Sequence, residues 1–300
     1  MNNFKSFLTE NRIKHESDYC VAMRSTFKIG GIASVAVFPK TVDELCDTVA
    51  SAYELGVKFE IIGNASNILF AFEKYNGALI FTSDIDGGYS VNGEKIYAEC
   101  GASLVRMSNI ARVNSLSGLE FACGIPARIG GALVMNAGAH GSSMSDIVEY
   151  TDALDIKSGE RIRIYDNRYG YRKSIYLEDA SLICLGASMR LTCGDKNKIS
   201  ELMRENSDKR RASQPIELPS AGSYFKRPEG DFAGRLIEEC GLKGETVGGA
   251  QVSPKHAGFI VNVGGASFYD VLALEEKIKE RVMSRFGVML CREVRLIEDR

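Results

Sequence analysis

The stretch that decides the fold lies at residues 118–141 and reads GLEFACGIPARIGGALVMNAGAHG, with six glycines among small and apolar residues. Glycine inside a helix or strand costs about 0.5–1 kcal/mol relative to alanine, so such a segment is not expected to form regular structure for its own sake. Close contact of the backbone with a flat, polar cofactor would explain the glycines. Tight packing inside the protein is the alternative explanation.

A second loop of small residues comes earlier in the chain, where an apolar strand expected at 58–62 runs into Gly63-Asn64-Ala65-Ser66-Asn67. Successive backbone N–H groups in such a loop can bind an anion, and small side chains let a diphosphate approach. A plain turn between two strands is the alternative, because Gly and Asn are common in turns. The loop is not a G-x-G-x-x-G that opens a helix, so a Rossmann-type site is not supported.

Helices and strands interleave around these loops without the regular alternation of a doubly wound sheet, which favours the α+β class. Thr41-Val42-Asp43-Glu44 has the spacing of a helix capping box, and Gly56 is a natural end for that helix. A charged segment, 195–211, ends at Gln214-Pro215 and is the candidate boundary between two domains. We further expect strands at 78–82, 95–99, 161–165, 182–191, 259–263 and 288–297, and helices at 104–115, 232–240 and from Ser267 onward.

The composition is that of an ordinary globular protein, with 300 residues of which 45% are hydrophobic and 25% charged. The length suggests two domains. A net charge of −2 and a pI near 6.1 argue against a general nucleic-acid binder. No apolar stretch approaches the ~20 residues of a membrane span, and the N-terminus lacks the pattern of an export signal. We therefore expect a soluble, cytoplasmic protein.

Eight cysteines occur, none in a C-x-x-C pair, and most lie in apolar runs. For a protein expected in the reducing cytosol, this pattern predicts free, buried thiols rather than disulfides or metal ligands. The three histidines, His15, His140 and His256, show no metal-ligand spacing. No metal site is expected.

Three segments resemble the FAD-binding domain of the UDP-N-acetylenolpyruvoylglucosamine reductase family: Thr26–Gly31 (TFKIGG), the loop Gly63–Asn67, and Gly124-Ile125-Pro126. That domain has the PCMH-type, or vanillyl-alcohol-oxidase, flavoprotein fold. The resemblance implies a non-covalently bound FAD, with its diphosphate on the loop Gly63–Asn67 and its ring and ribityl chain along Cys123–Gly138. The cofactor-binding residues that it implies are Gly63, Asn64, Ala65, Ser66, Asn67, Cys123, Gly124, Ile125, Pro126, Ile129, Gly130, Asn136 and Gly138.

Three further segments resemble the same family: Gly170–Ser174 (GYRKS), Pro219–Pro228 (PSAGSYFKRP) and Glu293-Val294-Arg295. Together with the FAD loops they cover most of the chain, and their order and co-occurrence make the resemblance specific. The domains that it implies are an FAD-binding domain of two subdomains at 1–192, completed by a C-terminal strand at 288–300, and a substrate-binding domain at 193–287.

The reaction implied by the resemblance is the reduction of an enolpyruvyl sugar nucleotide by hydride from NADPH through FAD, giving UDP-N-acetylmuramate for peptidoglycan. Arg172 would stabilise the negative charge that builds toward the substrate carboxylate. Ser223 would donate the proton, and a protonated Glu293 would donate a hydrogen bond to the enolate. Taken alone, each residue has an ordinary alternative: a surface arginine, a serine in a turn, and a charge pair of Glu293 with Arg295.

The resemblance also implies that Tyr171, Arg210, Arg227 and Lys243 bind the substrate, although each alone would more often be a solvated side chain. The expected partners are NADPH and the UDP-sugar, with no nucleic acid, membrane or obligate protein partner. The alternative function is that of a related PCMH-type FAD oxidoreductase acting on another substrate.

Two positions depart from the family pattern. Ala65 replaces a usual glycine, and we expect the local backbone to avoid a positive φ there, since alanine in that region costs about 1–3 kcal/mol. His140 stands where Tyr is common, which raises the idea of a covalent flavin, but the family binds FAD non-covalently. Ser223 follows Arg172 by only 51 positions. This interval leaves no room for an extra substrate-covering loop and resembles the shorter, type II form of the family.

Overall fold

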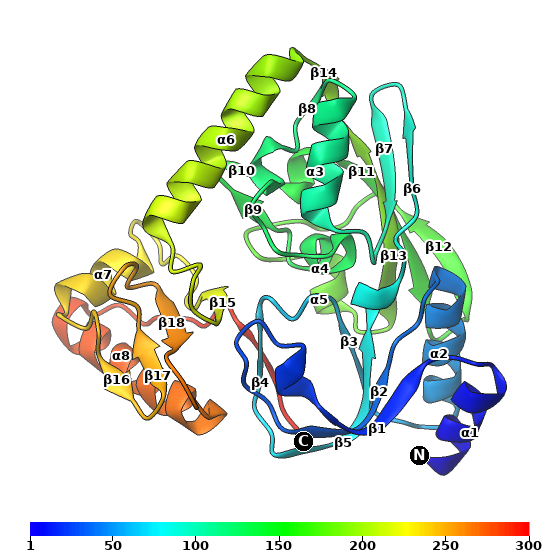
Figure 1. Cartoon of the computed structure of the whole chain (residues 1–300), viewed down its shortest axis with the longest axis horizontal. Helices are drawn as coiled ribbons and strands as arrows, with labels where there is room; N and C mark the ends of the chain where they lie inside the picture. Colours follow the sequence, from blue (N-terminus) through cyan, green and yellow to red (C-terminus); the bar gives the residue numbers. More distant parts are fainter. Residues whose placement is uncertain (300) are drawn as a thin grey trace. The chain divides into compact units, whose positions relative to one another are not determined.

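The computed structural model describes residues 1–299 and divides into two compact units (Figure 1). The first unit comprises residues 1–17, 35–64 and 77–209, and the second comprises 18–34, 65–76 and 210–300. In the described part of the chain, no helix is both long and apolar enough to cross a membrane. No three His, Cys, Asp or Glu side chains among these residues are grouped as metal ligands.

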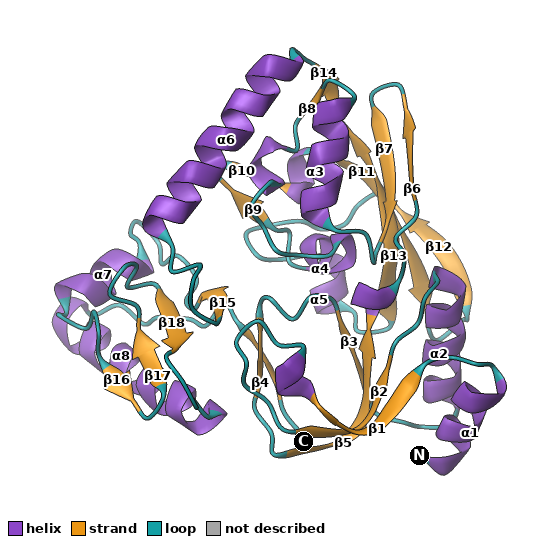
Figure 2. Cartoon of the chain, in the orientation of Figure 1, coloured by secondary structure: helices purple, strands orange, loops and turns teal. Residues whose placement is uncertain are grey.

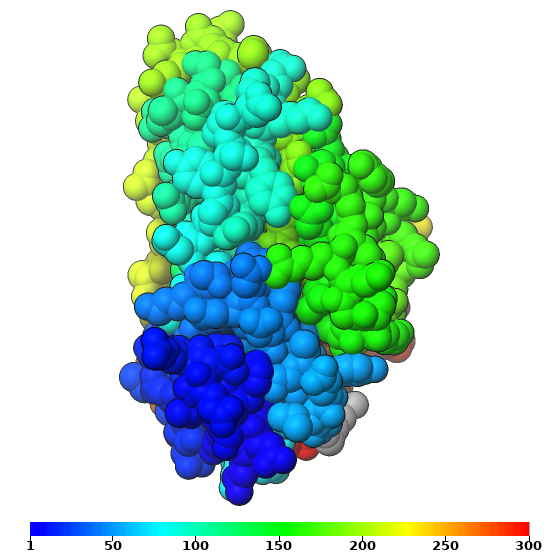
Figure 3. Space-filling view, turned by 90° about the vertical axis from the view of Figure 1, so that its right-hand side faces the viewer, coloured from blue at the N-terminus to red at the C-terminus, as the bar shows by residue number. Residues whose placement is uncertain are grey.

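The N-terminal part of the chain contains a four-stranded sheet with the strand order β1-β2-β5-β3. The helices α1 (Asn2–Glu10) and α2 (Val42–Glu54) pack against each other, and the surface that they form lies in the blue region of Figure 3. The capping residue of α2 is Thr41, whose side chain accepts a hydrogen bond from Glu44 N over 3.1 Å. The Glu44 carboxylate accepts from Lys40 N rather than from Thr41 N, so the predicted capping box forms only in part. The strands are β1 (His15–Cys20), β2 (Ile32–Val37), β3 (Phe59–Ile62) and β5 (Lys74–Phe81).

A five-stranded antiparallel sheet, in the order β12-β11-β13-β7-β6, forms most of the rest of the first unit (Figure 2). The helices α3 (Leu104–Val113) and α4 (Ile129–Val134) contribute Leu104, Met107 and Leu133 to the apolar core of this sheet. The strands are β6 (Tyr89–Asn92), β7 (Lys95–Glu99), β11 (Val148–Asp155), β12 (Glu160–Ile164) and β13 (Leu182–Arg190). Shorter elements are β8 (Leu116–Ser117), β9 (Gly138–Ala139), β10 (Ser142–Ser143), α5 (Ile175–Glu178) and β14 (Thr192–Cys193).

The second unit holds an antiparallel sheet in the order β15-β18-β17-β16, packed against α7 (Ala233–Glu239) and α8 (Phe268–Phe286). Val271, Leu274, Ile278 and Val282 recur at helical spacing in α8 and are fully buried in the core of this unit. The strands are β15 (Ser220–Ser223), β16 (Thr246–Val247), β17 (Ala250–Val252) and β18 (Phe259–Asn262), with a separate parallel pair of β4 (Ile68–Phe70) and β19 (Arg295–Ile297). The charged segment 195–211 forms α6 (Lys196–Ser213).

The mixed helix and strand content agrees with the expected α+β class, but the last predicted strand was wrong over most of its length. Only Arg295–Ile297 of the expected strand 288–297 is a strand, paired with β4. Upstream of it, a single bridge joins Phe225 to Arg292. Apolar alternation favours an extended chain, but a strand also needs a continuous neighbour to hydrogen-bond.

The exposure of the cysteines corrects a second expectation, namely that the thiols are buried. All eight cysteines are free, as predicted, but Cys193 and Cys291 are exposed rather than buried. Cys291 follows the apolar residues Val288-Met289-Leu290 in the expected strand 288–297, which does not form there. Cys20, Cys123 and Cys240 are partly exposed, so only Cys46, Cys100 and Cys184 are buried.

The N-terminus of α8 is held by a capping box, which gives a pH-dependent prediction. Asp270 N donates to Ser267 Oγ, and Ser267 N donates to the Asp270 carboxylate, at 3.1 and 2.9 Å. The hydrogen bond from Ser267 N, followed by one from Gly249 N, holds the pKa of Asp270 below its ordinary value of 3.8. Asp270→Ala should lower the free energy of unfolding by about 1 kcal/mol at pH 7.

Because the folded pKa is lowered, the contribution of Asp270 is present above the unfolded value near 3.8 and is lost as pH falls through the folded pKa. The difference between parent and variant should therefore persist down to about pH 4 and shrink below it. Urea unfolding across this range measures it. Glu280→Gln, on an exposed position of the same helix, is the control. A constant difference at all pH values would contradict the prediction.

Candidate active site

The loop Gly63–Asn67 follows β3 and leaves a row of backbone donors without partners. The N–H groups of Asn64, Ala65 and Ser66 donate to no other residue in the described chain. Within the first unit, Asn64 Nδ2 donates to Pro126 O over 2.8 Å, which joins the loop to the glycine-rich stretch 118–141. Adjacent, unsatisfied N–H groups with small side chains are the features that bind a phosphate anion. The loop therefore fits the diphosphate of a nucleotide cofactor.

Ala65 does not avoid the left-handed region, contrary to the expectation from the sequence. Its φ is +49°, a conformation that costs an L-residue about 1–2 kcal/mol. Two effects offset this cost. The methyl group is buried and contributes about 0.8 kcal/mol, and alanine lowers the entropy of the unfolded chain by about 0.4–1 kcal/mol relative to glycine. Alanine is therefore tolerated at this position.

Other non-glycine residues with positive φ also lie in the candidate segments. They include Lys28 at +58°, Asn136 at +42°, His140 at +54° and Arg172 at +52°. Backbone in sparsely populated regions is retained where the surrounding structure over-determines it, and such strain concentrates at functional sites. Positive φ also occurs outside these segments, at Arg12, Asp18, Ser115 and Arg168, so it does not by itself mark the candidate site.

The glycines of 118–141 differ in their surroundings. A Cβ on Gly130 would lie 2.9 Å from Cys100 Cβ, and one on Gly138 would lie 2.6 Å from Ser142 O. These two glycines are needed for packing. A Cβ on Gly131 or Gly141 would meet nothing within 4 Å. Packing therefore explains Gly130 and Gly138, and contact of this stretch with a cofactor stays a prediction.

Arg172 belongs to a tight hairpin beside the glycine-rich stretch, in the first unit. Gly170 and Lys173 exchange backbone hydrogen bonds of 3.2 Å around Tyr171 and Arg172. Arg172 Nη1 donates to Asn136 O over 3.3 Å, and Asn136 Nδ2 donates to Gly170 O over 3.0 Å. The structure thus brings together two predicted site residues, Asn136 and Arg172. Tyr171 is 57% exposed beside them.

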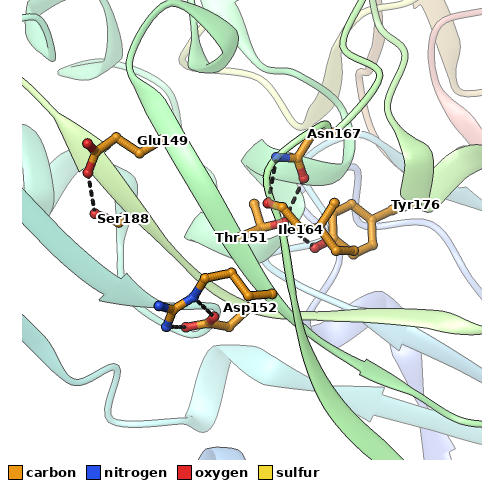
Figure 4. A network of polar contacts seen from close by, with 8 residues as sticks. Glu149, Thr151, Asp152, Ile164, Asn167, Tyr176 and Ser188 are labelled. Carbon is orange, nitrogen blue, oxygen red and sulfur yellow. Dashed lines mark hydrogen bonds and ion pairs between the residues drawn. The ribbon is translucent and has the colours of Figure 1, made fainter. Parts of the chain in front are cut away.

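A buried polar network holds the chain that leads into and out of this hairpin (Figure 4). Thr151 Oγ1 donates to Asn167 Oδ1 over 2.6 Å and accepts from the Tyr176 hydroxyl over 2.7 Å. Burial, the largest cause, raises the pKa of Tyr176, so its hydroxyl remains a donor. Ile175 N donates to Asn167 O over 2.8 Å. Because buried networks are strong when every member is satisfied, this one fixes both ends of the Arg172 hairpin.

Ser223 ends β15 in the second unit, next to a glycine with φ of +81° at Gly222. Ser223 is exposed, whereas the following residue, Tyr224, is buried. Thr26 Oγ1 lies 2.8 Å from Ser220 O and 3.2 Å from Ala65 O, within hydrogen-bonding distance of both. The side chain of Thr26 thus joins the start of β15 to the loop that contains Ala65.

Glu293 lies beside the same loop, also within the second unit. Asn67 Nδ2 donates to Glu293 O over 3.3 Å, and Arg295 N donates to Asn67 O over 2.9 Å. Glu293 N donates to Tyr224 O over 2.9 Å. Glu293 lies outside β19, although the expected strand 288–297 included it. The second unit thus brings together the loop end, the Ser223 segment and the Glu293 segment.

The proposed substrate-binding residues divide between the units: Tyr171 lies in the first, and Arg210, Arg227 and Lys243 in the second. The Arg227 guanidinium lies 4.4 Å from the centre of the Phe232 ring. Lys243 Nζ donates to Glu238 Oε1 over 2.6 Å in an exposed ion pair of little stabilising value. Sequence analysis missed the buried network of Thr151, Asn167 and Tyr176. The local sequence around each of these residues does not distinguish it from an ordinary core position.

Comparisons with known proteins show the family to which the chain belongs. A model of the UDP-N-acetylenolpyruvoylglucosamine reductase C-terminal domain matches residues 214–297, and a model of an FAD binding domain matches residues 33–165. The UDP-N-acetylenolpyruvoylglucosamine reductase of Caldanaerobacter subterraneus subsp. tengcongensis is 43% identical over 299 residues, covering 99% of this chain and 95% of that protein. The chain belongs to the UDP-N-acetylenolpyruvoylglucosamine reductase family.

Two further relatives support the assignment. The reductase of Pediococcus pentosaceus is 43% identical over 272 residues, which is 90% of each chain. The crystal structure of UDP-N-acetylenolpyruvylglucosamine reductase from Thermus caldophilus matches with a TM-score of 0.79 at 30% identity, covering 96% of this chain and 99% of that one. The resemblance seen in the sequence is confirmed, as is the combination of a PCMH-type FAD-binding domain with a C-terminal α+β domain.

The contact made by Thr26 gives a prediction for this family member. Thr26→Val keeps the shape of the side chain but removes the hydroxyl near two carbonyls, and should lower the free energy of unfolding by about 1–3 kcal/mol. Urea unfolding of the parent and the variant measures this. Thr192→Val, at an exposed strand position with no side-chain hydrogen bond in the described structure, should change stability by less than about 0.5 kcal/mol. Equal effects of the two substitutions would contradict the role given to Thr26.

Proposed function

We propose that this protein reduces UDP-N-acetylenolpyruvoylglucosamine to UDP-N-acetylmuramate, with NADPH as the hydride donor, as a step of peptidoglycan precursor synthesis in the cytoplasm. The observation that carries the proposal is the full-length similarity to reductases of that name, together with the open row of N–H groups at Asn64–Ser66. The alternative, a related FAD oxidoreductase with another substrate, gives no reason for the match of the reductase C-terminal domain.

The residues present fit an FAD. The loop Gly63–Asn67 offers its N–H groups to the diphosphate, and we assign the ring and ribityl chain to the residues between Cys123 and Gly138. We propose that the cofactor is held non-covalently, and that His140 forms no bond to it. As functional domains we propose residues 1–192, completed by 288–300, for FAD, and residues 193–287 for the sugar nucleotide.

The chemistry that FAD supplies when bound is transfer of a hydride from NADPH to the terminal carbon of the enolpyruvyl group. The Arg172 guanidinium stabilises the negative charge that develops on the adjacent carbon and its carboxylate, an effect worth several kcal/mol in a site that excludes water. Ser223 donates its hydroxyl proton to that adjacent carbon. We assign Glu293 to the enolate oxygen as its hydrogen-bonding partner.

The remaining predicted residues bind the substrate. Arg210, Arg227 and Lys243 supply positive charge for the diphosphate of the sugar nucleotide, and Tyr171 supplies an exposed ring and hydroxyl. The ion pair of Lys243 with Glu238 is exposed, so exchanging it for a phosphate contact costs little. The interval between Arg172 and Ser223 assigns the chain to the shorter form of the family.

The whole proposal is tested with the purified, yellow protein. Incubation with NADPH and UDP-N-acetylenolpyruvoylglucosamine should oxidise one nicotinamide for each sugar nucleotide, whose mass rises by two hydrogens. Acid precipitation should leave FAD in the supernatant. A colourless protein that cannot be reconstituted with FAD, or nicotinamide oxidation without a change in the mass of the sugar nucleotide, would contradict the proposal.

The role of Ser223 is tested by separating the two half-reactions without oxygen. Ser223→Ala should leave bleaching of the flavin by NADPH unchanged and slow reoxidation by the enolpyruvyl substrate by about 10²–10⁴-fold, the usual effect of losing a general acid. Stopped-flow absorbance follows both steps. Ser90→Ala, on an exposed strand, should leave both steps at the parent rate. Normal reoxidation of Ser223→Ala would remove Ser223 as the proton donor.

A further inference from the structure

Glu275 is a carboxylate that the proposed mechanism does not use, buried in the middle of α8. Its side chain is 0% exposed, and it lies among the apolar core positions Val271, Leu274 and Ile278. Removing a carboxylate from water costs several kcal/mol unless it is paired and hydrogen-bonded. A charged side chain at this position therefore needs an explanation.

The carboxylate is surrounded by three donors. The Tyr224 hydroxyl donates to Glu275 Oε2 over 2.7 Å, and Arg292 approaches the same oxygen through Nε at 2.8 Å and Nη2 at 2.7 Å. The other oxygen lies 2.6 Å from Lys279 Nζ, one turn along the helix. Burial first, and then the charge of Glu275, raises the pKa of Tyr224, so the phenol stays protonated and donates. Oε2 is thus hydrogen-bonded, whereas Oε1 is paired with the charge of Lys279 but accepts no hydrogen bond in the described structure.

Two of these donors are the chain neighbours of proposed catalytic residues. Tyr224 directly follows Ser223, and Arg292 directly precedes Glu293. The two segments also pair through their backbones: Glu293 N donates to Tyr224 O over 2.9 Å, and a bridge joins Phe225 to Arg292. One carboxylate therefore bonds to both segments on the core side, while Ser223 is exposed and Glu293 is partly exposed.

We propose that Glu275 is a positioning residue for the reduction, which holds Ser223 and Glu293 in a fixed mutual arrangement by binding Tyr224 and Arg292 at once. The inference rests on the roles proposed above for Ser223 and Glu293. The backbone link between the two segments is short, a single bridge with a hydrogen bond on either side, so side-chain contacts are needed to fix it. Displacement of a reacting group by about 1 Å costs on the order of 10²-fold in rate.

A purely stabilising role is the competing explanation, and the chemistry of buried ion pairs separates the two. Replacing a buried ion pair by apolar side chains of similar volume is often neutral or stabilising, whereas removing one partner is destabilising. Stability by itself therefore gives no reason for Glu275 and Arg292 in an otherwise apolar core. A need to fix the geometry of the neighbouring residues Ser223 and Glu293 does give a reason.

The first test uses the FAD-loaded protein and follows the two half-reactions separately. Glu275→Gln should leave reduction of the flavin by NADPH within about twofold of the parent, because Ser223 and Glu293 take no part in it. Reoxidation by UDP-N-acetylenolpyruvoylglucosamine should slow by about 10–100-fold, with little change in the substrate concentration that gives half the maximal rate. Glu276→Gln is the matched control, since Glu276 is exposed on the same helix and also contacts Lys279. It should behave as the parent.

The second test separates position from stability. In the triple variant Glu275→Leu, Arg292→Met and Tyr224→Phe, apolar side chains replace the ion pair and the hydroxyl that bonds to it, so the thermal midpoint should return to that of the parent or exceed it. Reoxidation should nevertheless remain slow. Recovery of both the midpoint and the rate would show a merely structural role and overturn the inference, as would equal slowing of both half-reactions in Glu275→Gln.

The outcomes also distinguish this inference from the proposed function. A parent protein that cannot be reoxidised by the enolpyruvyl substrate would overturn both. A parent with normal reoxidation and an equally fast Glu275→Gln variant would overturn the positioning role alone.

Discussion

The requirement that buried polar groups be hydrogen-bonded is the constraint on which the candidate site depends. In the first unit, Thr151, Asn167 and Tyr176 satisfy one another beneath the hairpin that bears Arg172. In the second unit, Glu275 plays the same part for the segments that bear Ser223 and Glu293. Each network would be costly if one member were removed, because the others would be left buried without a partner. Segments with few backbone hydrogen bonds of their own are thereby held in place by side-chain contacts.

The loop Gly63–Asn67 differs from these networks, because several of its backbone N–H groups donate to no residue in the described chain. These are the N–H groups of Asn64, Ala65 and Ser66, which are left available to a ligand. Their arrangement includes a left-handed alanine, whose strain is offset by burial of its methyl group and by the unfolded state. The hydrogen bonds of Asn64 to Pro126 and of Asn67 to Glu293 fix the two ends of the loop.

Glycine-rich sequence near a cofactor is commonly taken as evidence of cofactor contact, and 118–141 shows that this reasoning is incomplete. Gly130 and Gly138 are required by Cys100 and Ser142, which leave no room for a Cβ. Gly131 has open space around its Cα instead. Some glycines of this stretch are therefore required by close packing, and others leave the backbone accessible. The two kinds of glycine can be told apart only by the surroundings of each residue.

The sequence by itself determined the family, the α+β class, most of the helices and strands, and the segments that carry Arg172, Ser223 and Glu293. It could do so because capping boxes, apolar periodicity and glycine-rich loops are local patterns, in which the residues that act together are close in the chain. Only the tertiary structure decided that Ala65 adopts a positive φ, that the last strand is confined to Arg295–Ile297, and that Glu275 is buried. These depend on partners far away in the chain: Arg292 lies 17 positions from Glu275, and Tyr224 lies 51. Glu275 stands beside Glu276 in an amphipathic helix, which is the local pattern of a solvated side chain. Glu275 is buried only because segments distant in the sequence pack around it.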